Sequence, residues 1–390
     1  MRHRVERLYQ RMKIALLGHG TVGQGVDRII SERVGGVEVA RILELPDRLT
    51  DPRMTSSFED IANDSEIALV VECMGGLEPA HGFILRALAA GKSVVTSNKA
   101  VVAAYFREFA AAAAAGGAGL FIEATCGGGI PWIASIRKVR RIDDVRSFSG
   151  IMNGTTNYIV DAMSKNGADF DETLLRAQEL GYAERDPSAD IDGIDVKNKT
   201  IIAVGVAFDA ACTAELPVTG IRNLTRVDLE RFRAHGRTVK LLGRGVQGGG
   251  RYAAAVEPVA LSRHTLEANV PANFNLMSLD ATTVGPLKFY GQGAGMLPTG
   301  NAMVQDVLDA TAGVRPTYDL SRGLAWDPSL LTGDYVFRTM ASVPHAGAWE
   351  GDEGSKIVRG VTAVEARSLF ERACESDPST FMAALAKEGL

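Results

Sequence analysis

A glycine-rich turn near the start of the chain constrains the fold more than any other feature of the sequence. In KIALLGHGTVGQGV, an apolar run at residues 13–17 precedes Gly18, Gly20 and Gly23, and apolar residues then recur at helical spacing. In a G-x-G-x-x-G turn the first glycine permits a tight bend, the second lets the backbone approach a pyrophosphate, and the third lets helix and strand pack closely. The order strand, turn, helix favours a dinucleotide-binding α/β domain over a purely structural turn.

Strands and helices alternate through the rest of the first third, as a parallel sheet requires. The expected strands span residues 37–45, 67–73 and 93–96. The end of the first of these should meet the adenosine ribose, where an acid favours NAD and an arginine favours NADP. The sequence offers Glu44, Arg48 and Arg53 there, and the cofactor therefore stays open as NADP or NAD.

Ser97, Asn98 and Lys99 follow directly after the 93–96 strand. Ligands of an open parallel sheet bind beyond the carboxyl ends of its strands, so we expect Lys99 near the cofactor. A lysine in this position would otherwise be a solvated residue after a strand.

The segment DPSADIDGIDVKNK, residues 186–199, gathers four aspartates, a glycine and two lysines at a turn that leads into a helix. A calcium loop with Gly193 at its sixth position needs a glutamate at the twelfth, where this chain has Lys199. That excludes a calcium loop. A solvated acidic face also fits poorly, because the following helix, 194–208, is strongly apolar and should be buried.

Asp195 and Lys199 are spaced i, i+4, so both project from one face of that helix. A surface ion pair is the usual meaning of such spacing. Further carboxylates converge on the same entrance, namely Glu184, Asp186, Asp190 and Asp192. So many acids beside one lysine favour recognition of an amine together with proton transfer, although the residues alone leave the ion pair open. We expect Asp186 and Asp192 to serve the turn and the helix cap.

Composition narrows the classes of protein. The net charge of -5 gives no overall positive potential that would attract nucleic acid. The sequence also has no apolar run long enough to span a bilayer. The four cysteines are scattered without a C-x-x-C pair, which argues against disulfides and structural zinc and favours a reducing cytoplasm. Residues 1–11, MRHRVERLYQR, lack a secretory signal and are expected to be an N-terminal extension.

At this point the chain resembles a known family. AQELGYAERDPSADIDGIDVKNK (177–199) is similar to the signature of homoserine dehydrogenase, and LLGHGTVGQGV, VVTSNKA, EATCGGGIP, GIMNGTTNYI and FYGQGAGMLPTGNAM agree in order and spacing over about residues 12–310. The resemblance implies a Rossmann-type dinucleotide-binding domain followed by an α+β catalytic and dimerisation domain with a mixed sheet. The expected boundaries are 12–130 for the first domain and 131–310 for the second, with dimerisation at 131–150 and 285–310 and catalysis at 151–284.

The activity that the resemblance implies is NAD(P)-dependent interconversion of L-aspartate 4-semialdehyde and L-homoserine. Lys199 would be the proton donor, and Asp195 would orient water or the substrate hydroxyl. The implied substrate-binding residues are Glu184, Asp190, Thr155 and Tyr182. The implied cofactor-binding residues are Gly18, Gly20, Thr21, Val22, Gly23, Ser97, Lys99 and Gly295. A monovalent cation, sodium or potassium, is implied at Glu123, Cys126, Gly128 and Ile130.

Two features depart from the family's pattern. Leu45 stands where many members have an arginine, which leaves NADP preference in doubt. Residues 311–390 show one clear strand and one helix and no clear ACT domain, so their role is unknown. We expect a homodimer or a dimer of dimers acting on a small molecule in the cytoplasm, with no nucleic-acid or membrane partner. The rival hypotheses are another Rossmann-fold amino-acid dehydrogenase and a nucleotide-sensing regulatory protein on the same fold.

Overall fold

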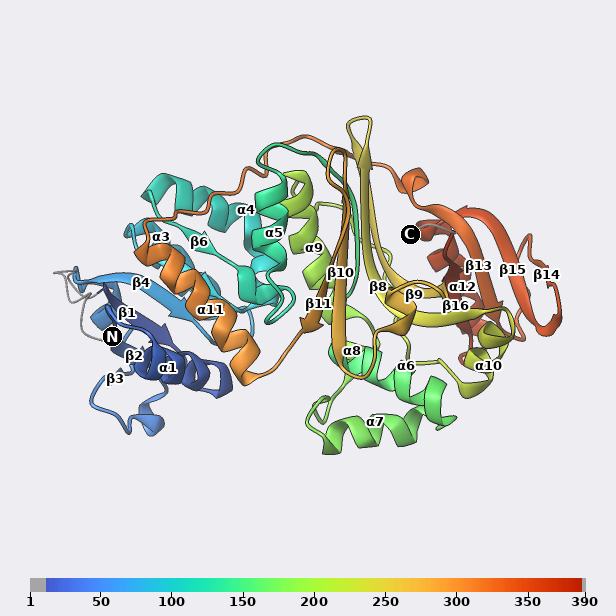
Figure 1. Cartoon of the computed structure of the whole chain (residues 1–390), viewed down its shortest axis with the longest axis horizontal. Helices are drawn as coiled ribbons and strands as arrows, with labels where there is room; N and C mark the ends of the chain where they lie inside the picture. The colour runs from blue at the N-terminus through green and yellow to red at the C-terminus, as the bar shows by residue number, and fades with distance from the viewer. Residues whose placement is uncertain (1–11, 388–390) are drawn as a thin grey trace, which may run out of the picture. The chain divides into compact units, whose positions relative to one another are not determined.

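The computed structural model describes residues 12–387, which form two compact units (Figure 1). The first unit holds the described residues up to Ile133 together with Ala294–Leu320, and the second holds Ala134–Gly293 and the described residues from Ser321 onward. The expected extension at 1–11 lies outside the described residues. Within the described part of the chain, no helix is both long and apolar enough to cross a membrane.

The first unit is built on a six-stranded sheet of order β3-β2-β1-β4-β5-β6, in which every neighbouring pair is parallel. Its elements are β1 (Met12–Leu17), α1 (Thr21–Arg33), β2 (Val37–Leu43), η1 (Pro46–Arg48), β3 (Met54–Thr55), α2 (Glu59–Ala62), β4 (Ile67–Glu72), α3 (Ala80–Ala89), β5 (Ser93–Thr96), α4 (Lys99–Gly116), β6 (Leu120–Phe121), η2 (Glu123–Thr125) and α11 (Met296–Thr311). Helix α5 (Trp132–Val139) leads into the second unit. The inner strands MKIALL and IALVVE are mostly apolar because helices cover both faces of such a sheet.

The first unit reaches further along the chain than the predicted boundaries. The sequence places residues 294–310 with the second domain, whereas the structure groups them with the first. The cause is α11, which packs closely against α1. A Cβ atom added at Gly25 would lie 2.9 Å from the carbonyl oxygen of Met296, so glycine permits this approach. Met303 and Val307 of α11 are buried in the same core as the strands.

The second unit is built on a ten-stranded mixed sheet of order β11-β10-β7-β8-β9-β16-β13-β15-β14, with β12 paired to β9. Strands β16 and β12 run parallel to β9, and the other pairs are antiparallel. The elements are β7 (Val145–Ile151), α6 (Gly154–Asn166), α7 (Phe170–Glu179), α8 (Ser188–Ile191), α9 (Ile194–Phe208), α10 (Arg226–Ala234), β8 (Arg237–Gly248), β9 (Arg251–Ser262), η3 (Glu267–Asn269), β10 (Phe274–Ala281), β11 (Gly285–Gln292), β12 (Ala325–Trp326), η4 (Pro328–Leu330), β13 (Thr332–Arg338), β14 (Gly347–Trp349), β15 (Asp352–Thr362), α12 (Ala363–Ser376) and β16 (Phe381–Leu385). The parallel first sheet and the mixed second sheet confirm the predicted fold class.

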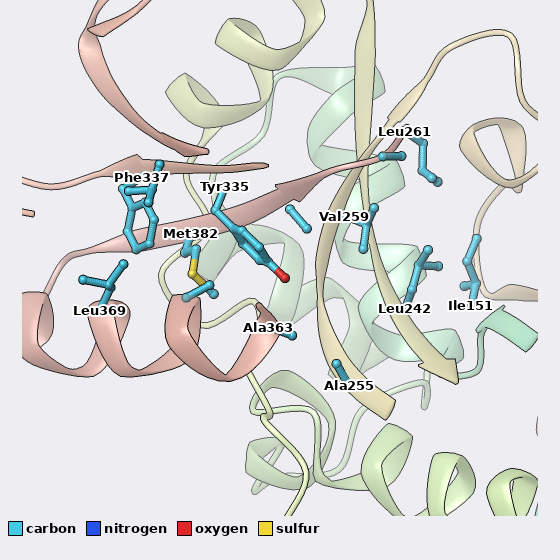
Figure 2. Packing of buried hydrophobic residues seen from close by; sticks show 14 of the residues in the cluster. Ile151, Leu242, Ala255, Val259, Leu261, Tyr335, Phe337, Ala363, Leu369 and Met382 are labelled. Atoms are coloured by element: carbon cyan, nitrogen blue, oxygen red, sulfur yellow. The ribbon is translucent and has the colours of Figure 1, made fainter. Parts of the chain in front are cut away.

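Residues 321–387 belong to the second unit and do not form a separate tail, whereas residues 311–320 belong to the first unit. Strand β16 pairs with β9 through Ala384 and Val259, and β13 and β15 continue the sheet. Figure 2 shows Tyr335, Phe337 and Met382 of this segment in one cluster with Val259 and Leu242 of the central strands. Only one strand was predicted here, because the other strands gain their apolar environment from this non-local pairing.

Candidate active site

The glycine turn of the first unit has the geometry that a pyrophosphate requires. Gly18 has φ +92°, a conformation that favours glycine, and a Cβ atom at Gly23 would lie 2.3 Å from the carbonyl oxygen of Gly18. Gly20 has no heavy atom within 4 Å of the position of a Cβ atom, so the backbone there is open. Thr21 and Val22 begin α1, as predicted. The turn therefore fits a bound dinucleotide with its phosphates at the N-terminus of α1.

The second predicted cofactor segment lies between β5 and α4. The side-chain oxygen of Asn98 accepts a hydrogen bond from the backbone N–H of Val101 and caps α4, while its amide donates to the carbonyl oxygen of Gly76. This cap fixes Ser97 beyond the strand and Lys99 at the first turn of the helix. Gly295, with φ +124°, precedes α11 in the same unit.

Glu72 is a buried acid that the sequence analysis did not single out. It ends β4, is 0% exposed, and accepts hydrogen bonds from the backbone N–H of Met74 and from the hydroxyl of Thr96. Burial raises the pKa of Glu72 to about 7. An acid at the end of an otherwise apolar strand was the available signal, and the side chain holds the segment that leads toward Gly76.

The free energy of unfolding should depend on pH because Glu72 has a raised pKa in the folded chain. Its pKa is about 7 in the folded chain against an ordinary 4.5, so the folded chain binds the proton more tightly and stability falls as pH rises between these values. Glu72→Gln cannot ionise. We compare the free energy of unfolding of this variant with that of the unchanged chain. The difference, variant minus unchanged chain, should therefore be about 2–3 kcal/mol more positive at pH 8 than at pH 5. Urea unfolding at the two pH values measures this, with exposed Glu38→Gln as a control; equal differences at both pH values would contradict it.

The acidic turn of the second unit places a lysine and an aspartate together inside the protein. The Lys199 ammonium donates to Asp195 Oδ2 at 2.8 Å and to the carbonyl oxygen of Met152 at 2.6 Å. The two side chains are only 9% and 7% exposed, because most of α9 is buried, as its apolar sequence predicts. The pair is therefore buried, and the surface ion pair that the sequence left open is excluded.

Asn153 links this pair to a second acid. Its amide nitrogen donates to Asp195 Oδ2 at 2.9 Å and to Asp190 Oδ1 at 2.6 Å, while its side-chain oxygen accepts from the backbone N–H of Thr156 and caps α6. Desolvation raises the pKa of Asp190, and the bond from Asn153 opposes that shift. Asn153 lies in GIMNGTTNYI, where no role was predicted for it; an asparagine before a helix was the signal for its cap.

Asn153 performs two tasks that substitutions can separate. Asn153→Ser keeps a side chain that caps a helix but cannot bridge two carboxylates, whereas Asn153→Ala loses both functions. We expect kcat to fall by up to about 100-fold in both variants, since small displacements of catalytic groups have effects of this size. The alanine variant, which also loses the helix cap, should be about 1 kcal/mol less stable than the serine variant. Steady-state kinetics with urea unfolding measures both; an unchanged kcat in the serine variant would contradict the bridging role.

The remaining predicted substrate residues lie on the segment that leads to this turn. Thr155 is buried and donates from its hydroxyl to the carbonyl oxygen of Tyr182 at 2.5 Å, which ties α6 to that segment. The Tyr182 ring packs edge-on against Tyr158, and Glu184 is exposed. The structure thus pairs Lys199 directly with Asp195 and joins Asp190 to Asp195 through Asn153. The Thr155 hydroxyl contacts the backbone of Tyr182.

The other two aspartates of the turn have different partners. Asp186 accepts from the backbone N–H of Ser188 at the start of α8, as expected for a turn residue. Asp192 instead forms a two-point ion pair with Arg222, through bonds of 2.7 and 2.6 Å. Asp192 is the C-cap residue of α8 through its backbone N–H, whereas its side chain does not cap α9, whose N-cap is Gly193.

The residues proposed for a cation follow β6 in the first unit. Glu123 is buried and begins η2; its Oε1 accepts from the backbone N–H of Ile133, and its own N–H donates to Asp306. The chain then turns through Cys126 and Gly128 to Ile130, whose carbonyl oxygen accepts from the backbone N–H of Trp132. Among the described residues, no three His, Cys, Asp or Glu side chains are arranged to hold a metal.

A glycine turn in a parallel sheet of this order, together with a buried lysine–aspartate pair, is typical of a dinucleotide-dependent oxidoreductase. The family model for homoserine dehydrogenase matches residues 131–308, and that for the homoserine dehydrogenase NAD-binding domain matches residues 18–123. The chain belongs to the homoserine dehydrogenase family.

Individual relatives agree with this assignment. The chain is 40% identical over 315 residues to the homoserine dehydrogenase of Synechocystis sp., covering 76% of this chain and 73% of that protein. It is 39% identical to that of Corynebacterium glutamicum, over 76% of this chain and 71% of that protein. The crystal structure of a homoserine dehydrogenase from Thiobacillus denitrificans superposes with a TM-score of 0.85 at 30% identity, covering 97% of this chain and 99% of that one.

Proposed function

We propose that the chain interconverts L-aspartate 4-semialdehyde and L-homoserine with NAD(P), in the biosynthesis of threonine, methionine and isoleucine. The observation that carries the proposal is the buried Lys199–Asp195 pair, which Asn153 connects to Asp190. Family membership supplies the reaction class, and the pair supplies groups able to move a proton at the substrate oxygen.

Reduction of an aldehyde leaves an oxyanion on the former carbonyl oxygen. When bound, the dinucleotide supplies the hydride. The Lys199 ammonium both stabilises the developing negative charge and donates the proton. Asp195 and the carbonyl oxygen of Met152 orient the ammonium. Because these partners are fixed and largely dry, little reorganisation is needed during the reaction.

Recognition of the substrate ammonium is assigned to Asp190 and Glu184. Asp190 is partly buried, and burial disfavours its charge, so a cationic ligand would restore a favourable partner. An analogue without the amine would leave a desolvated carboxyl unpaired, which gives selectivity. Thr155 and Tyr182 line the same pocket in this proposal.

The cofactor residues follow from the glycine turn and the β5–α4 connection of the first unit. Thr21, Val22, Ser97, Lys99 and Gly295 join Gly18, Gly20 and Gly23 in this set. The proposed sodium or potassium site uses Glu123 and the backbone of Cys126, Gly128 and Ile130, because oxygen ligands suit a hard monovalent cation. The proposed site of action is the cytoplasm.

A homodimer or a dimer of dimers is proposed through the parts of 131–150 and 285–310 that belong to the second unit. Strand β11 lies at the edge of the mixed sheet and carries Tyr290, which is 54% exposed. An unpaired edge with an exposed aromatic side chain favours pairing with a second copy. Catalysis is proposed for residues 151–284.

An assay with L-aspartate 4-semialdehyde and each reduced dinucleotide tests the function. We expect oxidation of the dinucleotide only when the aldehyde is present. Turnover with other amino-acid substrates but not with this aldehyde would support a different amino-acid dehydrogenase. Dinucleotide binding without turnover on any of them would support a regulatory protein.

A further inference from the structure

The turn after β2 in the first unit carries the charged side chains that would meet the adenosine ribose. We propose that Glu44 makes this chain selective for NAD over NADP, by accepting hydrogen bonds from the ribose hydroxyls and repelling a 2′-phosphate. The inference rests on the proposed use of a dinucleotide and goes beyond it, because NAD(P) chemistry alone does not favour either form.

Glu44 is held in a fixed orientation by two backbone groups. Its Oε2 accepts from the N–H of His19 at 3.0 Å, and its Oε1 accepts from the N–H of Leu45 at 3.0 Å. His19 lies within the glycine turn, between Gly18 and Gly20. The carboxylate therefore lies against the segment that would hold the dinucleotide, at the carboxyl end of a parallel strand.

The carboxylate of Glu44 can still accept hydrogen bonds from the adenosine ribose. A carboxylate offers about four acceptor positions on its two oxygens, and each oxygen of Glu44 accepts one hydrogen bond from a backbone N–H. Acceptor positions thus remain for the two adjacent hydroxyls of NAD. A 2′-phosphate has no proton to donate when ionised, so it would place negative charge against negative charge.

Arg53 is not available to neutralise a phosphate. Its guanidinium forms two bonds of 2.9 Å with Asp27 and is also bonded to Asp51, at 3.1 and 3.3 Å from Nε and at 2.8 Å from Nη2. The hydrogen bond from Arg53 lowers the pKa of Asp51 to about 2. Binding a phosphate through Arg53 would require breaking contacts with two carboxylates, each of which would lose its cation.

Two further positions in the turn bear on the choice. Leu45 is 54% exposed and offers no charge. Arg48, at the end of η1, is exposed, and its side chain forms no hydrogen bond or ion pair with the described residues. Arg48 is thus the one side chain of this turn that could compete with the proposal, and Asp47 beside it supplies a matched acidic control.

Fluorescence titration of the full chain with NADH and with NADPH tests the inference without any turnover. We expect NADH to bind at least about tenfold more tightly, which corresponds to about 1.4 kcal/mol. Glu44→Gln removes the charge at constant shape and should bring the two dissociation constants within about threefold, mainly by tighter NADPH binding. Asp47→Asn should leave the ratio within about twofold of its original value.

Three outcomes would overturn the inference. The first is NADPH binding as tight as NADH binding in the unchanged chain, and the second is an unchanged ratio in Glu44→Gln. The third is a selective loss of NADPH affinity of tenfold or more in Arg48→Ala, which would assign phosphate recognition to that arginine. Failure of both dinucleotides to bind would overturn the proposed function together with this inference, whereas the first three outcomes leave the proposed function intact.

Discussion

Replacing Lys199 by methionine is expected to lower kcat for reduction of the aldehyde by at least about 100-fold. Positioned proton transfer contributes about 100- to 10,000-fold in enzymes, and methionine has no proton to donate. The affinity for reduced dinucleotide should change by less than about twofold, because Lys199 is not among the proposed cofactor-binding residues. Steady-state kinetics and fluorescence titration measure the two quantities.

Lys197→Met is the matched control, since this lysine lies on the same helix, outside the buried pair. Its kcat should stay within about twofold. Loss of the Lys199 ammonium also leaves Asp195 buried without its cation, which destabilises a protein. Adding Asp195→Asn should restore stability but not turnover. Turnover that survives Lys199→Met would remove the lysine from its proposed role.

Replacing Arg244 by methionine is expected to destabilise the second unit by about 3–5 kcal/mol, because it leaves a buried carboxylate without its cation. Arg244 of β8 pairs with Glu257 of β9, which is 2% exposed. The hydroxyl of Tyr335 in β13 also donates to Glu257, at 3.3 Å. This network connects the C-terminal strands to the centre of the sheet. Urea unfolding measures the loss.

Two variants separate the charge from the packing around it. Tyr335→Phe removes one hydrogen bond and should cost about 1 kcal/mol. The double variant with methionine at both 244 and 257 removes the ion pair altogether and should recover most of the loss, as replacement of buried pairs by apolar residues often does. If Arg244→Met alone lowers the free energy of unfolding by less than about 1 kcal/mol, the Arg244–Glu257 pair is not excluded from water as proposed.

Local patterns in the sequence were sufficient to predict the parallel sheet and the buried Lys199–Asp195 pair. The glycine turn has a fixed spacing, and an i, i+4 pair on an apolar helix lies on one face whatever the rest of the fold does. The spacing of Asp195 and Lys199 predicted their contact, and the apolar sequence of α9 predicted their burial. Both follow from residues within one element.

Features that depend on distant segments were not predictable in this way. The link from Asn153 to Asp190 and Asp195 joins residues 37 and 42 positions apart. The pairing of β16 with β9 joins residues more than a hundred positions apart, and α11 returns to the first unit after the whole of 134–293. Each depends on the pairing of complete elements, for which the local sequence carries no signal.

The central claim is that this chain forms L-homoserine, and product analysis tests it most directly. The chain is incubated with L-aspartate 4-semialdehyde and NADH, and in parallel with NADPH, while the oxidised dinucleotide and the amino acids formed are quantified together. We expect L-homoserine in equimolar amount to the dinucleotide oxidised, and almost none with Lys199→Met. Dinucleotide oxidation without L-homoserine, or no oxidation with either dinucleotide, would contradict the claim.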